Sequence, residues 1–293
     1  MMAVESAAIK NALQEGSVIP YLGPGVLALN AANASVPSSP ESLVQRLVAK
    51  ASVPHKIRNN LTAAAQFVEN FKHRKTLVGI MNEAFSVAAQ ATQLQRFLAA
   101  LNSSPMIVDV WYDNAMAAAL GDCFGNSKSA PWGQVQGLSQ SEHFGRWTQA
   151  YRADSTPVDD TDIGQWQTLL YKPLGGVAPA KNYLVSDTDF VEVLTEIDIQ
   201  TPIPSAVQQR RSGRSFLFLG CRFANQLERT FARQIMKRSS AKHWAVLPDA
   251  LTKNERRFLA EQNIQRIEMP LEEFAATLTQ VQENPTQRQV VNC

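Results

Sequence analysis

Apolar residues recur along the chain in two alternating patterns, one typical of buried strands and one typical of amphipathic helices. Short apolar runs predict strands at 18–22, 106–111, 168–171, 183–185, 215–219, 244–247 and 264–268, and helical periodicity predicts helices at 4–15, 114–120, 187–196, 225–238, 253–262 and 271–281. Strands that alternate with helices of about 10 to 15 residues pair in parallel through right-handed crossovers. The sequence therefore predicts an α/β fold, a Rossmann-like parallel sheet with helices on both faces.

Two stretches interrupt this alternation. Residues 31–103 show helical periodicity alone, at 41–51, 61–72, 75–86 and 90–102, and Ser39-Pro40-Glu41 starts the first helix with an N-cap, a proline and an acid. Residues 121–165 are rich in Gly, Ser, Gln and Asp with little periodicity, which indicates a small irregular insertion. We predict a single domain over residues 1–282 that carries a helical insertion (31–103) and this irregular one, followed by a flexible tail at 283–293.

The composition narrows the class of protein. The 293 residues are 45% hydrophobic, which predicts a packed core, and 28 Lys+Arg against 26 Asp+Glu leave a net charge of +2, too small to steer the chain to nucleic acid or membrane. No run approaches the roughly 20 apolar residues of a membrane span, and Met1–Glu15 lacks the apolar region of a secretory signal. We expect a cytoplasmic protein.

The cysteines and histidines do not predict a metal site. Cys123, Cys221 and Cys293 are too few and too scattered for a disulfide framework or a four-cysteine zinc site. The four histidines lack metal-ligand spacing, and His143 is either a surface residue or one that approaches a site from the irregular stretch. We therefore predict no zinc.

Two glycine-containing turns follow predicted strands. Glycines in Gly23-Pro24-Gly25 would let backbone amides approach a phosphate, and Gly23-x-Gly25-x-x-Ala28 fits the relaxed dinucleotide fingerprint. However, no helix is predicted immediately after this turn, and no acid ends a strand about 20 residues further on. A tight structural turn is therefore the alternative to nucleotide binding.

The second turn is Gly220-Cys221-Arg222, after the strand 215–219. In an open α/β sheet both turns would face one crevice at the carboxyl ends of the strands. Arg222 would meet a phosphate there, or else face solvent near a helix start. We interpret Cys221 as a small buried residue rather than a nucleophile.

Other candidates have a structural and a functional interpretation. Trp111 and Asp113 follow the strand residues 106–110 and are a core aromatic and an N-cap, or they line the crevice. Three basic residues recur on one helix and form a solvated face or a stripe that binds nucleic acid; they are Arg229, Arg233 and Lys237. Three others lie in a predicted linker, where they serve solubility or hold an anion or acidic partner; they are Arg210, Arg211 and Arg214.

Five blocks, in order, resemble the sirtuin-like (silent-information-regulator-like) domain of prokaryotes, in the branch that includes NAD-cleaving anti-phage proteins. The first strand and its turn have Pro24 in place of the alanine of the family's Gly-Ala-Gly, and other blocks resemble the Thr-Thr-Asn-Tyr-Asp, Tyr-Lys-Leu-His-Gly-Ser and Leu-Phe-Leu-Gly-Tyr-Ser-Phe motifs. The blocks are Val18–Val26, Leu61–Phe85, Ile107–Leu120, Leu170–Gly176 and Phe216–Phe223, and they span most of residues 5–275. The resemblance implies a Rossmann-like fold and an NAD-related function.

The departures from the family motifs concern its catalytic groups. The resemblance puts Trp111 where the family has the asparagine that engages the nicotinamide ribose, and Leu174 where it has the histidine base. A shifted register would place Asn114 at the asparagine position, but Tyr112-Asp113 match the motif without that shift. Tryptophan offers one donor and leucine offers no polar group, and loss of a positioned base costs about 10²–10⁴ in rate.

The glycine turns that would contact the phosphates of a ligand match the family motifs better than the catalytic positions do. This difference favours an ADP-ribose-type ligand over intact NAD. The candidate cofactor-binding residues are Gly23, Pro24, Gly25, Val26, Trp111, Asp113, Gly220, Cys221 and Arg222. Deacylating sirtuins carry a four-cysteine zinc module that is absent here, so protein deacylation is not expected.

Three functions follow from this pattern. The first is a catalytically impaired sirtuin-like protein that binds NAD or an ADP-ribose-type nucleotide and acts through contacts with a protein partner or a second copy of the chain. The second is an active NAD glycohydrolase in which Asp113 or His143 is the substitute base. The third is a scaffold or assembly protein with a vestigial pocket.

Overall fold

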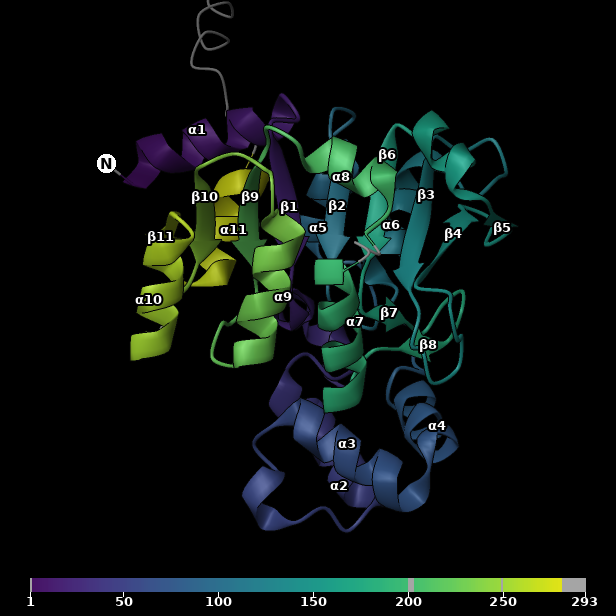
Figure 1. The fold of residues 1–293 in the computed structure, drawn as a ribbon. Helices are drawn as coiled ribbons and strands as arrows, with labels where there is room; N and C mark the ends of the chain where they lie inside the picture. The colour runs from purple at the N-terminus through teal and green to yellow at the C-terminus, as the bar shows by residue number, and fades with distance from the viewer. Residues whose placement is uncertain (1, 200–202, 249, 281–293) are drawn as a thin grey trace, which may run out of the picture.

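A mostly parallel sheet forms the centre of the molecule (Figure 1), in a computed structural model that describes residues 2–199, 203–248 and 250–280. Its strands are β1 (Val18–Leu22), β2 (Met106–Asp109), β3 (Trp132–Gly137), β4 (Thr148–Arg152), β5 (Pro157–Val158), β6 (Thr168–Lys172), β9 (Ser215–Leu219), β10 (His243–Val246) and β11 (Ile264–Ile267). The order is β11-β10-β9-β1-β2-β6-β3-β4-β5; pairing is parallel from β11 to β3 and antiparallel at β4 and β5. The predicted α/β, Rossmann-like fold is confirmed.

Helices cover both faces of this sheet. One layer contains α1 (Met2–Gln14), α5 (Gln93–Ala99), α6 (Ala115–Phe124) and α11 (Leu271–Thr279), and the other contains α7 (Asp187–Ile199), α8 (Ser205–Arg211), α9 (Gln226–Met236) and α10 (Lys253–Glu261). Successive side chains of a strand point to opposite faces, so Ile19 and Tyr21 join one core while Val18 and Leu22 join the other. Burial on both faces explains why these strands are continuous apolar runs.

The helical insertion lies at the carboxyl ends of the central strands (Figure 1). It contains α2 (Pro40–Lys50), α3 (Leu61–Lys72) and α4 (Arg74–Ala84), and Ser39 caps α2 as predicted. Arg74 ties the insertion to the sheet domain, because its guanidinium lies 2.8 Å from Asp189 on α7 and donates to the carbonyl of Tyr183. The last helix predicted within 31–103 is α5, and it packs on α6 and α11 in a layer of the sheet.

The interpretation of residues 121–165 as irregular is wrong. They contain β3, β4, β5 and a 3-10 helix, and β3 pairs with β6 from Trp132 to Gln136. The strand lacks an apolar pattern because its buried glutamines, Gln134 and Gln136, both donate to the carbonyl of Ala178. Its Gly133 packs against an aromatic ring, since a Cβ there would lie 2.4 Å from the indole of Trp166.

The segment interpreted as a basic linker is helix α8. Arg210 donates to the carbonyls of Ile163 and Trp166, and Arg214 donates to that of Gly16. Arg211 is buried and donates to the last carbonyls of α9, where a cation also complements the helix dipole. These arginines join elements of the fold instead of facing an anion.

One further sequence prediction differs in part from the structure. The strand predicted at 183–185 is β8 (Asn182–Tyr183), which pairs with β7 (Gly175–Gly176) in a separate two-stranded sheet. The predicted tail, 283–293, lies outside the described residues.

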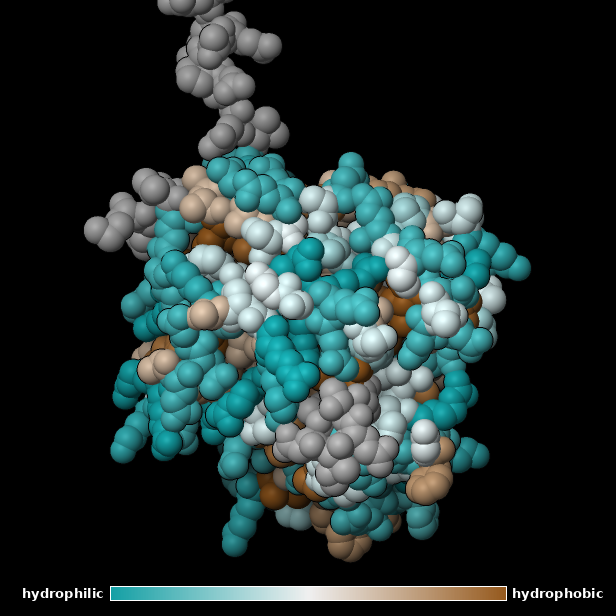
Figure 2. Space-filling model, turned by 45° about the horizontal axis from the view of Figure 1, so that its top comes forward, coloured by the Kyte–Doolittle hydropathy of each residue, from teal (hydrophilic) through white to brown (hydrophobic). Residues whose placement is uncertain are grey.

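Figure 2 shows a face on which hydrophilic residues predominate and hydrophobic residues form small, separate areas.

The two predicted glycine turns meet where the direction of the strand order reverses, between β1 and β9. Gly23 donates its amide hydrogen to the carbonyl of Leu219 at 2.8 Å, and Gly25 donates to that of Gly220 at 3.0 Å. Gly220 has φ +67, and a Cβ there would lie 2.6 Å from the amide nitrogen of Val26. The contact between the turns therefore requires glycine at position 220.

Gly220→Ala should lower the free energy of unfolding by more than Gly213→Ala, its matched control. Gly213 has a similar φ of +70, but a Cβ at this position would meet no atom within 4 Å, so its substitution costs only the left-handed backbone penalty of about 1–2 kcal/mol. The overlap at Gly220 should add about 1–3 kcal/mol. Urea denaturation measures both, and equal losses would contradict the close contact.

Candidate functional site

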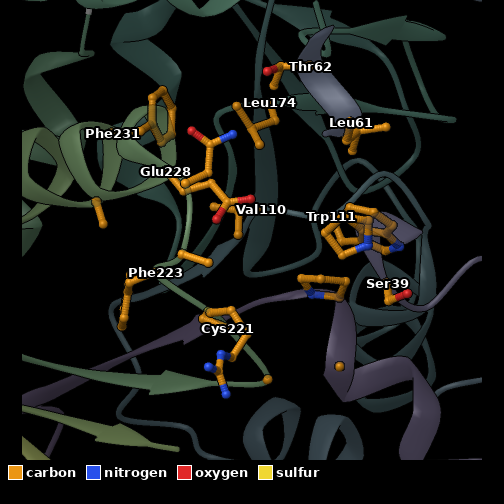
Figure 3. A pocket seen from close by; sticks show the side chains of 18 of the residues that line it. Ser39, Leu61, Thr62, Val110, Trp111, Leu174, Cys221, Phe223, Glu228 and Phe231 are labelled. Atoms are coloured by element: carbon orange, nitrogen blue, oxygen red, sulfur yellow. The ribbon is translucent and has the colours of Figure 1, made fainter. Parts of the chain in front are cut away.

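A cavity of about 530 Å³ lies at the carboxyl ends of β1, β2 and β9, with α2 and α3 of the insertion on its far side (Figure 3). Its volume falls in the range of small-molecule sites, and open α/β sheets bind ligands at this position, the topological switch point. Its lining includes residues at the carboxyl ends of three strands, namely Tyr21, Pro24 and Gly25, Val110–Tyr112, and Gly220–Asn225. The rest of the lining comes from residues 38–41 and 59–62 of the insertion, from Leu174 and Phe190, and from Glu228, Phe231 and Ala232 on α9.

The glycine turn after β1 forms a wall of this cavity, but its amides already have partners. Gly23 and Gly25 donate to carbonyls of the other turn, and Val26 donates to the carbonyl of Gly23 at 3.2 Å. A 3-10 helix, η1 (Pro24–Leu29), begins inside the turn, so the prediction that no helix follows at once is wrong. The glycines serve the contact between the turns, and these three amides are not available as phosphate donors.

One end of the cavity contains the indole of Trp111, and Leu174 lines the cavity between this end and Glu228 (Figure 3). The indole of Trp111 is buried, packs edge-on against Phe85, and donates its N–H to the carbonyl of Pro37 at 2.7 Å. Leu174 is also buried and lines the cavity beside Val110. Because the only polar group of the indole already has a partner, neither side chain can activate water or bind a ligand hydroxyl.

Beneath this end, a buried ion pair fixes the backbone of Trp111. The ammonium of Lys172 lies 2.7 Å from Asp109 and donates to the carbonyl of Trp111 at 2.6 Å. Asp113 accepts from the amide of Ala115 at the start of α6, and burial, with the nearby Asp109 charge, raises the pKa of Asp113 to about 6. The N-cap of α6 is Asn114, so the prediction that Asp113 is the N-cap is wrong by one residue. Asp113 is buried and does not line the cavity, so its placement does not favour the substitute base.

The second turn contributes Cys221 and Arg222 to the cavity wall. Burial raises the pKa of the Cys221 thiol far above its usual value, which keeps it protonated and unreactive. Arg222 pairs with Glu255, with Nε 3.1 Å from the carboxylate, and Glu255 also forms the capping box of α10 with Thr252. Arg222 therefore borders the cavity with its guanidinium held by another element.

Glu228 is an acidic cavity residue that was not among the candidates predicted from the sequence. It lies in the first turn of α9 and points into the cavity, across from Trp111 and Ser39 (Figure 3). Burial raises its pKa to about 7, and the carboxylate of Glu41 on α2 also raises it. The available signal was its spacing, because Glu228 precedes the buried Phe231 and Ile235 by three and seven residues and so shares their helix face.

A comparison with protein families decides the classification. The model of the SIR2-like domain matches residues 105–267, which is more than half of the chain. This chain belongs to the SIR2-like domain family. No curated protein matches it. The predicted resemblance is thus confirmed at the level of the family, and the matched range includes Trp111, Leu174 and the second glycine turn.

Other predicted candidates of this SIR2-like domain lie away from the cavity. His143 is in the loop between β3 and β4 and is not part of the lining. On α9, Arg229 donates to the carbonyls of Phe223 and Ala224, and Arg233 lies 3.8 Å from Glu261. Within the described ranges, no three His, Cys, Asp or Glu residues gather as metal ligands would, and no helix has the length and apolar character to cross a bilayer.

Glu228→Gln should stabilise the protein more at high pH than at low pH. The folded-state pKa of Glu228 lies above its usual 4.5, so the wild type loses stability as the pH rises from 4.5 to about 7, whereas glutamine stays neutral. We expect the difference in unfolding free energy between variant and wild type to grow by on the order of 1 kcal/mol between about pH 5 and about pH 8. The same charge removal at Glu272→Gln, exposed on α11, is the control. A difference that does not vary with pH would contradict the raised pKa.

Proposed function

We propose that this SIR2-like domain binds a nucleotide of the NAD or ADP-ribose type in the cavity and does not cleave it. The observation that carries the proposal is the apolar end of the cavity. There the resemblance places an indole and a leucine in the positions of the family's asparagine and histidine, and the indole N–H is already bonded to Pro37. A SIR2-like domain without these groups lacks the base that prepares water for attack.

The residues present fit a nucleotide in volume and in the distribution of polar groups. The cavity combines an apolar end with polar side chains from the insertion and from the start of α9, namely Ser38, Asn59, Asn225 and Glu228. Hydroxyl groups of a ribose would meet these side chains, and a base would pack on the aromatic and aliphatic surface. Phosphate groups would rely on Arg222 and on side-chain amides, because the amides of the first glycine turn are occupied.

A domain that holds its ligand unchanged acts through its contacts with other molecules. The cavity is lined both by the sheet domain and by the helical insertion, so a bound nucleotide would join the two. We propose that the bound state is recognised by a protein partner or a second copy of the chain, in the cytoplasm. A protein of this kind is a pseudoenzyme of the family.

Glu228 favours a second candidate function, an NAD glycohydrolase. Its carboxyl faces the cavity, and a carboxylate can stabilise the oxocarbenium-like transition state in which a glycosidic bond breaks. In this alternative Glu228 takes the role that the sequence analysis gave to Asp113 or His143. The two candidates differ in whether nicotinamide is released.

The purified protein should bind ADP-ribose with a dissociation constant in the micromolar range, about −8 kcal/mol, and should release no nicotinamide from NAD. Titration calorimetry measures the binding, and chromatography of an NAD incubation measures the release. Ser38→Trp places a bulky ring in the cavity lining and should weaken binding at least about tenfold, whereas Ser127→Trp, on an exposed loop, should not.

Each alternative has its own outcome in these assays. Sustained nicotinamide release that is lost in Glu228→Gln would contradict the proposal and support the glycohydrolase. Absence of binding to ADP-ribose, NAD and NADH alike would support the scaffold protein with a vestigial pocket.

A further inference from the structure

The charges around the cavity are distributed unevenly. Glu41 and Glu228 face it from the first turns of α2 and α9, whereas the guanidinium of Arg222 is bound to Glu255. The half of the cavity near Glu228 is therefore acidic. A ligand with two phosphates cannot be placed in it in every orientation, because phosphate groups near these carboxylates would be repelled.

No ion-pair partner of Glu228 occurs among the described residues. Arg229, the next residue, directs its guanidinium to the carbonyls of Phe223 and Ala224. The other titratable side chains around Glu228 are Glu255, which is bound to Arg222, and three neutral groups. These are Tyr21 on β1, Tyr112 after β2 and Cys221, and burial raises the pKa of each, which keeps them neutral. The carboxyl of Glu228 thus keeps acceptor capacity for a ligand.

A carboxyl group that faces a cavity distinguishes ligands by whether they place hydroxyl groups or phosphate groups next to it. Vicinal hydroxyls donate hydrogen bonds to carboxylate oxygens, whereas a phosphate offers only acceptors and negative charge. A site that pairs its buried polar group with one ligand and leaves it unpaired or repelled with another discriminates strongly between the two.

We propose that Glu228 selects and orients the ligand: its carboxyl accepts hydrogen bonds from ribose hydroxyls and keeps phosphate groups out of its half of the cavity. This inference rests on the proposed nucleotide binding. It places the terminal ribose of ADP-ribose between Glu228 and the indole of Trp111, where Leu174 also lines the cavity (Figure 3). The phosphates then lie toward Arg222 and the glycine turns.

ADP-ribose and ATP test this inference, because both contain adenosine diphosphate and differ in the terminal group, a ribose or a phosphate. The wild type should bind ADP-ribose at least about tenfold more tightly than ATP, as measured by calorimetry at about pH 8. Glu228→Gln should reduce this ratio to about threefold or less, mainly by tighter ATP binding. The distant Glu272→Gln control should keep the wild-type ratio.

A second variant separates the two roles of the carboxyl. Glu228→Asp keeps the negative charge but moves the carboxylate back from the ligand, because the aspartate side chain is one methylene shorter. ATP should therefore remain excluded while ADP-ribose binds more weakly. Lowering the pH to about 6 protonates Glu228. The preference for ADP-ribose over ATP should therefore become smaller in the wild type but not in Glu228→Gln. Circular dichroism melting shows whether each variant is folded, and the pH series on the wild type needs no variant.

The outcomes distinguish this inference from the proposed function. If ADP-ribose binds and the ratio is unchanged in Glu228→Gln and with pH, the role of Glu228 is wrong while nucleotide binding stands. If ATP binds as tightly as ADP-ribose in the wild type, the inference is equally overturned. If neither ligand binds, this inference is overturned, and the proposed function is overturned with it when NAD and NADH also fail to bind.

Discussion

The close contact between the turns after β1 and β9 is the constraint on which the site depends. The two strands pair in register over all five residues, from Val18↔Ser215 to Leu22↔Leu219, and their turns continue the pairing by backbone hydrogen bonds. Only glycine at 23 and 220 permits this approach. Because the turns close against each other, the cavity forms above them, between the ends of the strands and the helical insertion.

The cavity that results has two chemically different parts. The buried pair of Lys172 and Asp109 holds the carbonyl of Trp111, and the indole is fixed against Phe85 and bonded to Pro37, so this end presents apolar surface. Opposite it, α9 presents Glu228. A buried ion pair contributes little net stability once its desolvation cost is counted, so we interpret the Lys172–Asp109 pair as a device that positions the end of β2.

Much of this could be predicted from the sequence because most central strands are buried on both faces. Residues 18–22 and 216–219 are uninterrupted apolar runs, and the motif order identified the SIR2-like family, which the family match confirms. β3 could not be predicted because its polar side chains are satisfied by a distant carbonyl, that of Ala178. Glu228 was missed because an acid in the first turn of a helix is also what a solvated helix start favours. The availability of the glycine amides depends on a contact between segments about 200 residues apart, which no local pattern reveals.

The central claim is that this SIR2-like domain binds a nucleotide across the two parts of its cavity but lacks the catalytic groups that would cleave its glycosidic bond. A crystal structure of the protein grown with NAD tests it most directly. The claim predicts intact NAD in the cavity, with ribose hydroxyls within hydrogen-bond distance of Glu228 and phosphates on the Arg222 side. Density for ADP-ribose alone beside released nicotinamide, or for a ligand whose phosphates face Glu228, would contradict it.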